Sequence, residues 1–305
     1  NPREMQPDEL ERLSRGFMRA ISRYVGLTKD SPAPDVYTNP QIMAWMLDEY
    51  EVLTGHHEPG AITGKPLQLG GSAGRGPATA MGGMFTIREA AKLRGMTLEG
   101  ATCAIQGYGN VGGFAHRLAH DLFGMKVVAV SDEYGGIYSA NGLNPNDVVK
   151  HLQQTGKVIG CPGTDNINNK ELLELDVDIL IPAAIENQLT GQNANQIKAK
   201  IVAELANGPT TPEADNILND KGIYIIPDFL CNAGGVIVSY FEMVQNAYQF
   251  YWDEPMVNDR LDKKITTAFL AVHDMAQAKK VDNRVAAYLV AVNRVAEAVR
   301  LRGWV

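Results

Sequence analysis

The 305-residue sequence is poor in features that mark several classes of protein. Its three cysteines, Cys103, Cys161 and Cys231, share no metal-type spacing, which indicates reduced thiols in a cytosolic protein. Its longest apolar runs have the length of a strand, and no signal peptide opens the chain, so we expect no membrane span. Lysine and arginine are scattered and the net charge is −7, which argues against a nucleic-acid-binding protein.

The rest of the composition is that of an ordinary globular protein, 45% hydrophobic and 21% charged, whose length suggests about two domains. Apolar residues at helical spacing predict helices at both ends of the chain. The expected helices are 8–25, 40–54, 84–95, 110–123, 233–250, 255–279 and 284–302. Asn39 is the expected N-cap of the second helix, and Gly55 follows its end.

From residue 101 the pattern changes to short apolar runs without alternation. Such runs are typical of parallel strands that are buried on both faces by helices. The expected strands are 101–106, 126–131, 177–182, 200–204 and 223–227. The sequence therefore predicts an α/β fold, with a Rossmann-like doubly wound sheet.

A glycine motif follows the first of these strands. Gly107, Gly109 and Gly112 form G-x-G-x-x-G before the expected helix 110–123, whose N-terminus would face a pyrophosphate. Asp132 lies twenty residues beyond Gly112, where a carboxylate should bind a ribose diol. The strand, the helix and the acid together favour a dinucleotide site over a plain strand–helix turn.

The acidic end of the second strand bears on which dinucleotide binds. Asp132 and Glu133 place negative charge where a 2′-phosphate would sit, and no basic residue follows before Gly135. We therefore expect NAD, with NADP as the less favoured alternative. His56 and His57 have no third ligand at a suitable spacing, so we expect a solvated loop there and no metal site.

Long motifs along the chain carry a resemblance to a known family. They are "PAPDVYTNPQIMAWMLDEY", "GYGNVGG", "ILIPAAIENQLT", "ELANGPTTPEAD" and "NAGGVIVSYFEMVQN". With these motifs the chain resembles the hexameric glutamate dehydrogenases over essentially its whole length. The resemblance implies reversible oxidative deamination of L-glutamate to 2-oxoglutarate and ammonia by a cytoplasmic homohexamer.

The resemblance also implies roles for particular residues. Asp35 matches the catalytic proton shuttle, and Ser239 matches a residue that binds the side-chain carboxylate of the substrate. Arg75 is expected to make a structural or cofactor-side contact. The residues expected to bind the cofactor are Thr79, Gly107, Gly109, Asn110, Val111, Gly112, Asp132, Ala183, Asn207 and Asn232.

The chain starts after the point where the family carries a glycine-rich loop with its catalytic lysine. We therefore expect an N-terminally truncated copy that binds NAD but has negligible activity alone. The expected domains are 1–70, a remnant of the substrate and oligomerisation domain, 71–280, the NAD-binding domain, and 281–305, a helix that returns to the remnant. Part of the apolar face of that helix (Ala286, Leu289, Val290 and Val295) is expected to be exposed. Ala80 and Leu205 stand where glycine is common in the family.

Two other functions stay open from the sequence. One is another amino-acid dehydrogenase of the leucine, phenylalanine or valine type, and Ser239 is the residue that discriminates against it. The other is a non-catalytic NAD-binding fragment.

Overall fold

The computed structural model describes residues 2–35 and 37–304. The helices of the first part are α1 (Pro7–Ile21), α2 (Pro40–Thr54) and α3 (Ala78–Leu93). The helices that follow are α4 (Asn110–Phe123), α5 (Pro145–Thr155), α6 (Asn169–Leu173), α7 (Pro212–Asp220), α8 (Asp228–Cys231), α9 (Gly234–Tyr248), α10 (Glu254–Lys279) and α11 (Asn283–Leu301). The strands are β1 (Thr102–Gln106), β2 (Lys126–Asp132), β3 (Gly135–Tyr138), β4 (Asp165–Ile167), β5 (Ile179–Pro182), β6 (Ile201–Ala203) and β7 (Tyr224–Ile226).

The chain forms two compact units. The first contains residues 1–78 and 235–261, and the second contains 79–234 and 262–305, so one boundary falls within α10. These limits differ from the domain boundaries expected from the sequence, which stay a prediction. In the first unit, α1 and α2 enclose a core that includes Met18, Met43 and Met46, because both helices present apolar residues to each other.

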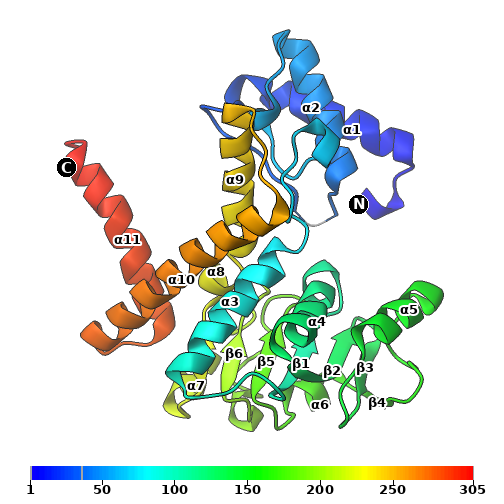
Figure 1. The fold of residues 1–305 in the computed structure, drawn as a ribbon, viewed down its shortest axis with the longest axis vertical. Helices are drawn as coiled ribbons and strands as arrows, with labels where there is room; N and C mark the ends of the chain where they lie inside the picture. Colours follow the sequence, from blue (N-terminus) through cyan, green and yellow to red (C-terminus); the bar gives the residue numbers. More distant parts are fainter. Residues whose placement is uncertain (1, 36, 305) are drawn as a thin grey trace. The chain divides into compact units, whose positions relative to one another are not determined.

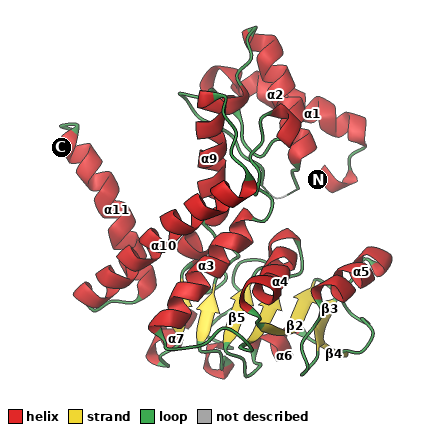
Figure 2. Ribbon diagram, in the orientation of Figure 1, coloured by secondary structure: helices red, strands yellow, loops and turns green. Residues whose placement is uncertain are grey.

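Within residues 2–35 and 37–304, the strands form one seven-stranded sheet in the second unit, in the order β4-β3-β2-β1-β5-β6-β7. Figure 1 shows this sheet from β6 to β4, and Figure 2 draws its strands in yellow. β2, β1, β5, β6 and β7 are parallel, and they coincide with the five apolar runs predicted from the sequence. β3 and β4 are antiparallel additions at one edge and were not predicted. The expected α/β class with a mostly parallel sheet is confirmed.

Successive strand residues point to opposite sides of the sheet, so the apolar strands place apolar side chains on both faces, and helices cover each face. Cys103 and Ile105 of β1 join a core with apolar residues of α3, α4 and α10. Ala104, between them, joins a second core with residues of α6 and α7. The sheet is therefore doubly wound, and the loops at its carboxyl ends are left to build a site.

The last helix starts on the second unit and then leaves its core. Ala286 is buried in the core beside β7, contrary to the expectation that this position is exposed. Val290 is partly buried against the same core, whereas Leu289 and Val295 are exposed, as expected. None of the helices in residues 2–35 and 37–304 combines the length and the apolarity needed to cross a membrane.

Candidate functional site: the carboxyl edge of the sheet

The residues predicted to bind the dinucleotide follow the carboxyl ends of the parallel strands. Gly107 follows β1, Asp132 ends β2, and Ala183 follows β5. Asn207 lies four residues after β6, and Asn232 follows α8, the short helix after β7. Because parallel strands all end at the same edge, the fold brings these positions together along it. β1 has β2 as its neighbour on one side and β5 on the other, so the chain connections from β1 and from β5 run in opposite directions across the sheet. Open α/β sheets bind ligands at the point where the connections diverge in this way.

The glycine turn after β1 has no room for side chains at two of its glycines. Gly107 has φ +94°, and a Cβ there would lie 2.8 Å from the carbonyl oxygen of Ala183. A Cβ on Gly112 would overlap the carbonyl oxygen of Gly107. Gly109 differs, since its φ is −79° and a Cβ there would meet no heavy atom within 4 Å. The fold itself requires Gly107 and Gly112, whereas the space over Gly109 is open for a ligand.

The start of α4 offers backbone donors to that space. Asn110 is the first residue of α4 and is exposed, and the N-cap Gly109 has no side chain to bind the N–H groups of the first turn. In α2 and α7, by contrast, Asn39 and Thr211 cap the helix with their side chains. An uncapped helix N-terminus carries partial positive charge and unpaired N–H groups, so this turn suits a pyrophosphate. Val111, the next residue, packs partly against the core.

Asp132 lies at the edge with both carboxylate oxygens already in use. Its Oδ1 accepts a hydrogen bond from the Tyr134 N–H (2.8 Å), and its Oδ2 accepts one from the Val158 N–H (2.6 Å). A carboxylate oxygen has two lone pairs, so each can accept a further bond from a ribose hydroxyl. The side chain is half-buried, while Glu133 beside it is exposed. The acid is thus held in place by the turn that follows β2.

The other end of the edge is built by two asparagines. The Asn232 Nδ2 donates to the Asn207 side-chain oxygen at 2.7 Å and lies 3.4 Å from the Leu205 carbonyl oxygen. Thr79 is the second residue of α3, which packs close to the same segments. A Cβ on Gly83, one turn further along α3, would lie 2.5 Å from the Leu205 side chain. The structure therefore brings Thr79, Asn207 and Asn232 to neighbouring segments of the second unit.

The residues predicted to contact the substrate lie in the first unit. Ser239 of α9 is only 6% exposed, and its hydroxyl accepts a hydrogen bond from the Arg75 Nε at 2.9 Å. Burial lowers the pKa of Arg75, and the nearby Glu242 carboxylate opposes that change. The predicted proton shuttle, Asp35, is exposed in a turn in which its N–H and the Thr38 hydroxyl are 2.7 Å apart. The arrangement places a cation directly on the hydroxyl of Ser239.

One turn after Ser239, α9 carries an ion pair that the sequence analysis did not identify. Lys65 and Glu242 are fully buried, with the Lys65 Nζ 2.5 Å from the Glu242 Oε1. Burial lowers the pKa of Lys65, and the Glu242 charge counteracts it. Glu242 also accepts the Gly64 N–H at 3.0 Å. The pair ties α9 to the loop that leads to Arg75, and it therefore helps to fix the Ser239–Arg75 contact.

The sequence analysis also missed the polar residues that support the edge from within the second unit. Arg284, in the last helix, contacts carboxylates that lie 56 to 80 residues away along the chain. No motif spacing could have signalled contacts of this range. The sequence offered one weak signal, namely that Arg284 follows the N-cap Asp282 at the start of a mostly apolar helix.

Comparison with known proteins agrees with this architecture. The family model for Glutamate/Leucine/Phenylalanine/Valine dehydrogenase matches residues 70–303, and the model for the Glu/Leu/Phe/Val dehydrogenase dimerisation domain matches residues 1–52. A curated relative, the NAD-specific glutamate dehydrogenase of Staphylococcus aureus (strain COL), is 52% identical over 304 residues, which are 100% of this chain and 73% of the relative.

Solved structures give the same result. The hetero-hexameric glutamate dehydrogenase of Thermus thermophilus (Leu bound form) superposes with a TM-score of 0.94 at 37% identity, over 99% of this chain and 71% of that one. The glutamate dehydrogenase of Peptoniphilus asaccharolyticus gives a TM-score of 0.86 at 39% identity, over 100% and 73% of the two chains. The chain belongs to the Glu/Leu/Phe/Val dehydrogenase family.

Proposed function

We propose that the protein is an NAD-dependent glutamate dehydrogenase that interconverts L-glutamate with 2-oxoglutarate and ammonia. The observation that carries this proposal is the 52% identity, along the whole chain, with a relative named NAD-specific glutamate dehydrogenase. The open space over Gly109 and the acid at the end of β2 support the choice of NAD, because the acid disfavours a 2′-phosphate.

The residues of the carboxyl edge fit a dinucleotide. When bound, NAD accepts a hydride from the carbon that carries the amino group. The N–H groups at the start of α4 (Asn110, Val111) would hold the pyrophosphate, and Asp132 would accept hydrogen bonds from the ribose. We assign the nicotinamide half to Thr79, Ala183, Asn207 and Asn232. The last three follow β5, β6 and β7 along the chain, and Thr79 lies in the first turn of α3.

We propose that Ser239 binds the side-chain carboxylate of the substrate. Its hydroxyl accepts from Arg75, so its own proton is free to be donated to a carboxylate oxygen, and the guanidinium adds positive charge close by. Asp35 is proposed to move protons between the amino group, water and the intermediate, a role for which its exposed position in a turn gives it access to solvent.

The discriminating test is a comparison of substrates. Reductive amination is measured with 2-oxoglutarate and with 2-oxoisocaproate, each with NADH and with NADPH, and binding of each compound is measured by calorimetry. We expect 2-oxoglutarate and NADH to be preferred in binding and in whatever turnover occurs, and from the sequence we expect that turnover to be low. A preference for 2-oxoisocaproate would assign the protein to the leucine type, and binding of NAD without binding of 2-oxoglutarate would favour a non-catalytic NAD-binding fragment.

A matched pair of variants tests the role of Ser239. Ser239→Ala should raise the dissociation constant of 2-oxoglutarate roughly 10- to 100-fold, the contribution of one hydrogen bond to a charged group, while binding of 2-oxoisocaproate is little affected. Ser14→Ala is the control, because Ser14 is also 6% exposed and lies in the same unit, while its hydroxyl donates to the Leu10 carbonyl within α1. Equal effects of the two variants would contradict the assignment.

We further propose a cytoplasmic homo-oligomer. Three free, buried cysteines agree with a reducing compartment, and the similar protein from Thermus thermophilus is a hetero-hexamer, which supports an assembly of several subunits of this fold. Light scattering of the purified protein measures the number of subunits, and a monomer at micromolar concentration would contradict this part of the proposal.

A further inference from the structure

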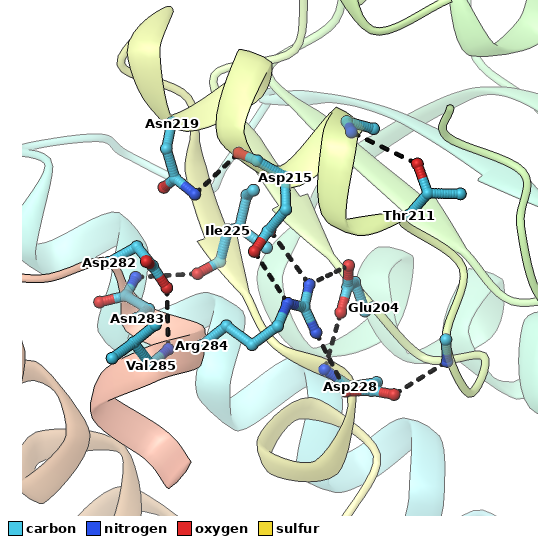
Figure 3. Close-up of polar contacts among 12 residues, drawn as sticks. Glu204, Thr211, Asp215, Asn219, Ile225, Asp228, Asp282, Asn283, Arg284 and Val285 are labelled. Carbon is cyan, nitrogen blue, oxygen red and sulfur yellow. Dashed lines mark hydrogen bonds and ion pairs between the residues drawn. The ribbon is translucent and has the colours of Figure 1, made fainter. Parts of the chain in front are cut away.

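The Arg284 side chain, in the first turn of α11, is surrounded by three carboxylates of the second unit (Figure 3). Its Nη2 donates to Glu204 at 2.7 Å, its Nε to Asp215 at 3.0 Å, and its Nη1 to Asp228 at 3.2 Å. Only 19% of the Arg284 side chain is exposed, and the Glu204 side chain is fully buried. Arg284 therefore stands between three acids that come from three different segments.

The acids depend on this one cation. Burial raises the pKa of Glu204, and the Arg284 guanidinium opposes the rise. Burial alone would lower the pKa of Arg284, but its bonds to Glu204 and Asp215 outweigh burial and raise it. If the cation were removed, the fully buried Glu204 and the largely buried Asp228 would be left as like charges without their counter-charge, which is costly unless they take up protons or move apart.

The same acids hold the backbone of the edge. The second oxygen of Glu204 accepts the Asp228 N–H at 2.8 Å, and the second oxygen of Asp228 accepts the Gly208 N–H at 2.8 Å (Figure 3). Gly208 has φ +55° and directly follows Asn207. Segment 204–208 is therefore tied to Arg284 at both ends, directly at Glu204 and through Asp228 at Gly208.

The start of α11 is itself fixed. Asp282 caps the helix by accepting the Val285 N–H at 2.8 Å, and the Asn283 Nδ2 donates to the Ile225 carbonyl of β7 at 2.8 Å. The first contact orders the first turn of the helix around Arg284, and the second holds that turn against β7. The guanidinium is thus presented at a defined place, which is what a positioning role requires.

We propose that Arg284 is a positioning residue that fixes segment 204–208, and with it Asn207, for the nicotinamide end of the cofactor site. Arg284 does not touch the cofactor in this proposal, and it acts through Glu204 and Asp228. The part that concerns the cofactor rests on the proposed function, whereas the ordering of the segment does not.

The test compares Arg284→Gln with Arg284→Lys and with a control, Arg88→Gln. Arg88 makes a similarly short ion pair with Asp262 (2.6 Å) in the same unit, with 23% of its side chain exposed, and its hydrogen bonds go to Glu89, Asp262 and Thr266. Amide hydrogen exchange of the free proteins is followed at Gly208 and Asp228, and the NAD dissociation constant is measured by calorimetry. We expect exchange at both amides at least about tenfold faster in Arg284→Gln, the factor for one charged hydrogen bond, with weaker NAD binding. Arg284→Lys should restore part of the amide protection and part of the NAD affinity, and Arg88→Gln should change neither quantity.

The outcomes separate the two proposals. Unchanged exchange at Gly208 in folded Arg284→Gln or Arg284→Lys protein, or an equal change in Arg88→Gln, would overturn the positioning role. Faster exchange with an unchanged NAD dissociation constant would overturn its link to the cofactor. If the parent chain binds no NAD, the proposed function fails, while the exchange measurement still decides whether Arg284 orders the segment.

Discussion

Two glycines of the same motif should respond in opposite ways to a single methyl group. In Gly112→Ala the new Cβ would overlap the carbonyl oxygen of Gly107, so backbone must move. In Gly109→Ala the Cβ enters open space, and the backbone there (φ −79°, ψ −158°) is accessible to alanine. The first substitution therefore perturbs the fold, and the second perturbs only a ligand that lies over the turn.

The magnitudes follow from these contacts. Overpacking at Gly112 should cost about 1–3 kcal/mol, which lowers the melting temperature of a unit of this size by roughly 2–10 °C. Gly109→Ala should leave stability unchanged or raise it by up to about 1 kcal/mol, because alanine restricts the unfolded chain. Its methyl group would meet a pyrophosphate that approaches the backbone, and a loss of about 1–3 kcal/mol weakens NAD binding roughly 5- to 150-fold.

The assay pairs a thermal melt with a calorimetric NAD titration for the parent and both variants. We expect Gly109→Ala to keep the melting temperature and lose affinity, and Gly112→Ala to melt earlier. If Gly109→Ala bound NAD as tightly as the parent, no phosphate would approach the turn and our placement of the cofactor would be wrong.

Three other predictions concern buried charge and the ribose site. Lys65→Met leaves the buried Glu242 carboxylate without its counter-charge and should lower the free energy of unfolding in urea by about 3–5 kcal/mol. Lys200→Met, at an exposed ion pair, should lower it by at most about 1 kcal/mol. Similar losses in the two variants would refute the role of burial. Burial lowers the pKa of His116 to about 4, so between pH 6.5 and 4 the unfolded chain binds a proton that the folded chain does not, and the free energy of unfolding should fall as the pH drops through about this range. In urea unfolding, His116→Gln should show a smaller fall with pH. An equal dependence of the free energy of unfolding on pH in both proteins would contradict this. Asp132→Ala should weaken NAD binding roughly tenfold or more in calorimetry, while Glu133→Ala, at an exposed side chain, should not; equal losses would place the ribose elsewhere.

The parallel part of the sheet could be predicted from the sequence because burial on both faces leaves unalternated apolar runs. β3 and β4 escaped prediction for physical reasons. β3 is four residues long and begins with two glycines, and β4 is three residues long with two exposed polar side chains. Neither carries enough apolar surface to signal a strand, and their pairing depends on the neighbouring β2.

The candidate site divides in the same way. The turn at Gly107 and Gly112 and the strand end at Asp132 could be predicted because the motif reflects local geometry, namely a tight turn, a close helix approach and a strand end, while the binding of a dinucleotide there stays a prediction. The partners of Asp132, Tyr134 and Val158, depend on how the following loop folds back, so spacing did not indicate them. The Arg284 cluster is still further from prediction, because it joins residues from distant segments by charge alone.

The contact of Asn283 with β7 bears on how this sheet ends. β7 is the outermost strand beside β6, and such a strand presents backbone groups to which a foreign strand can pair. The Asn283 amide occupies one of these groups, the Ile225 carbonyl, and α11 packs beside the strand. α11 thus covers part of the free edge of β7, and loss of this helix would expose the Ile225 carbonyl to pairing with a strand of another molecule, which favours aggregation.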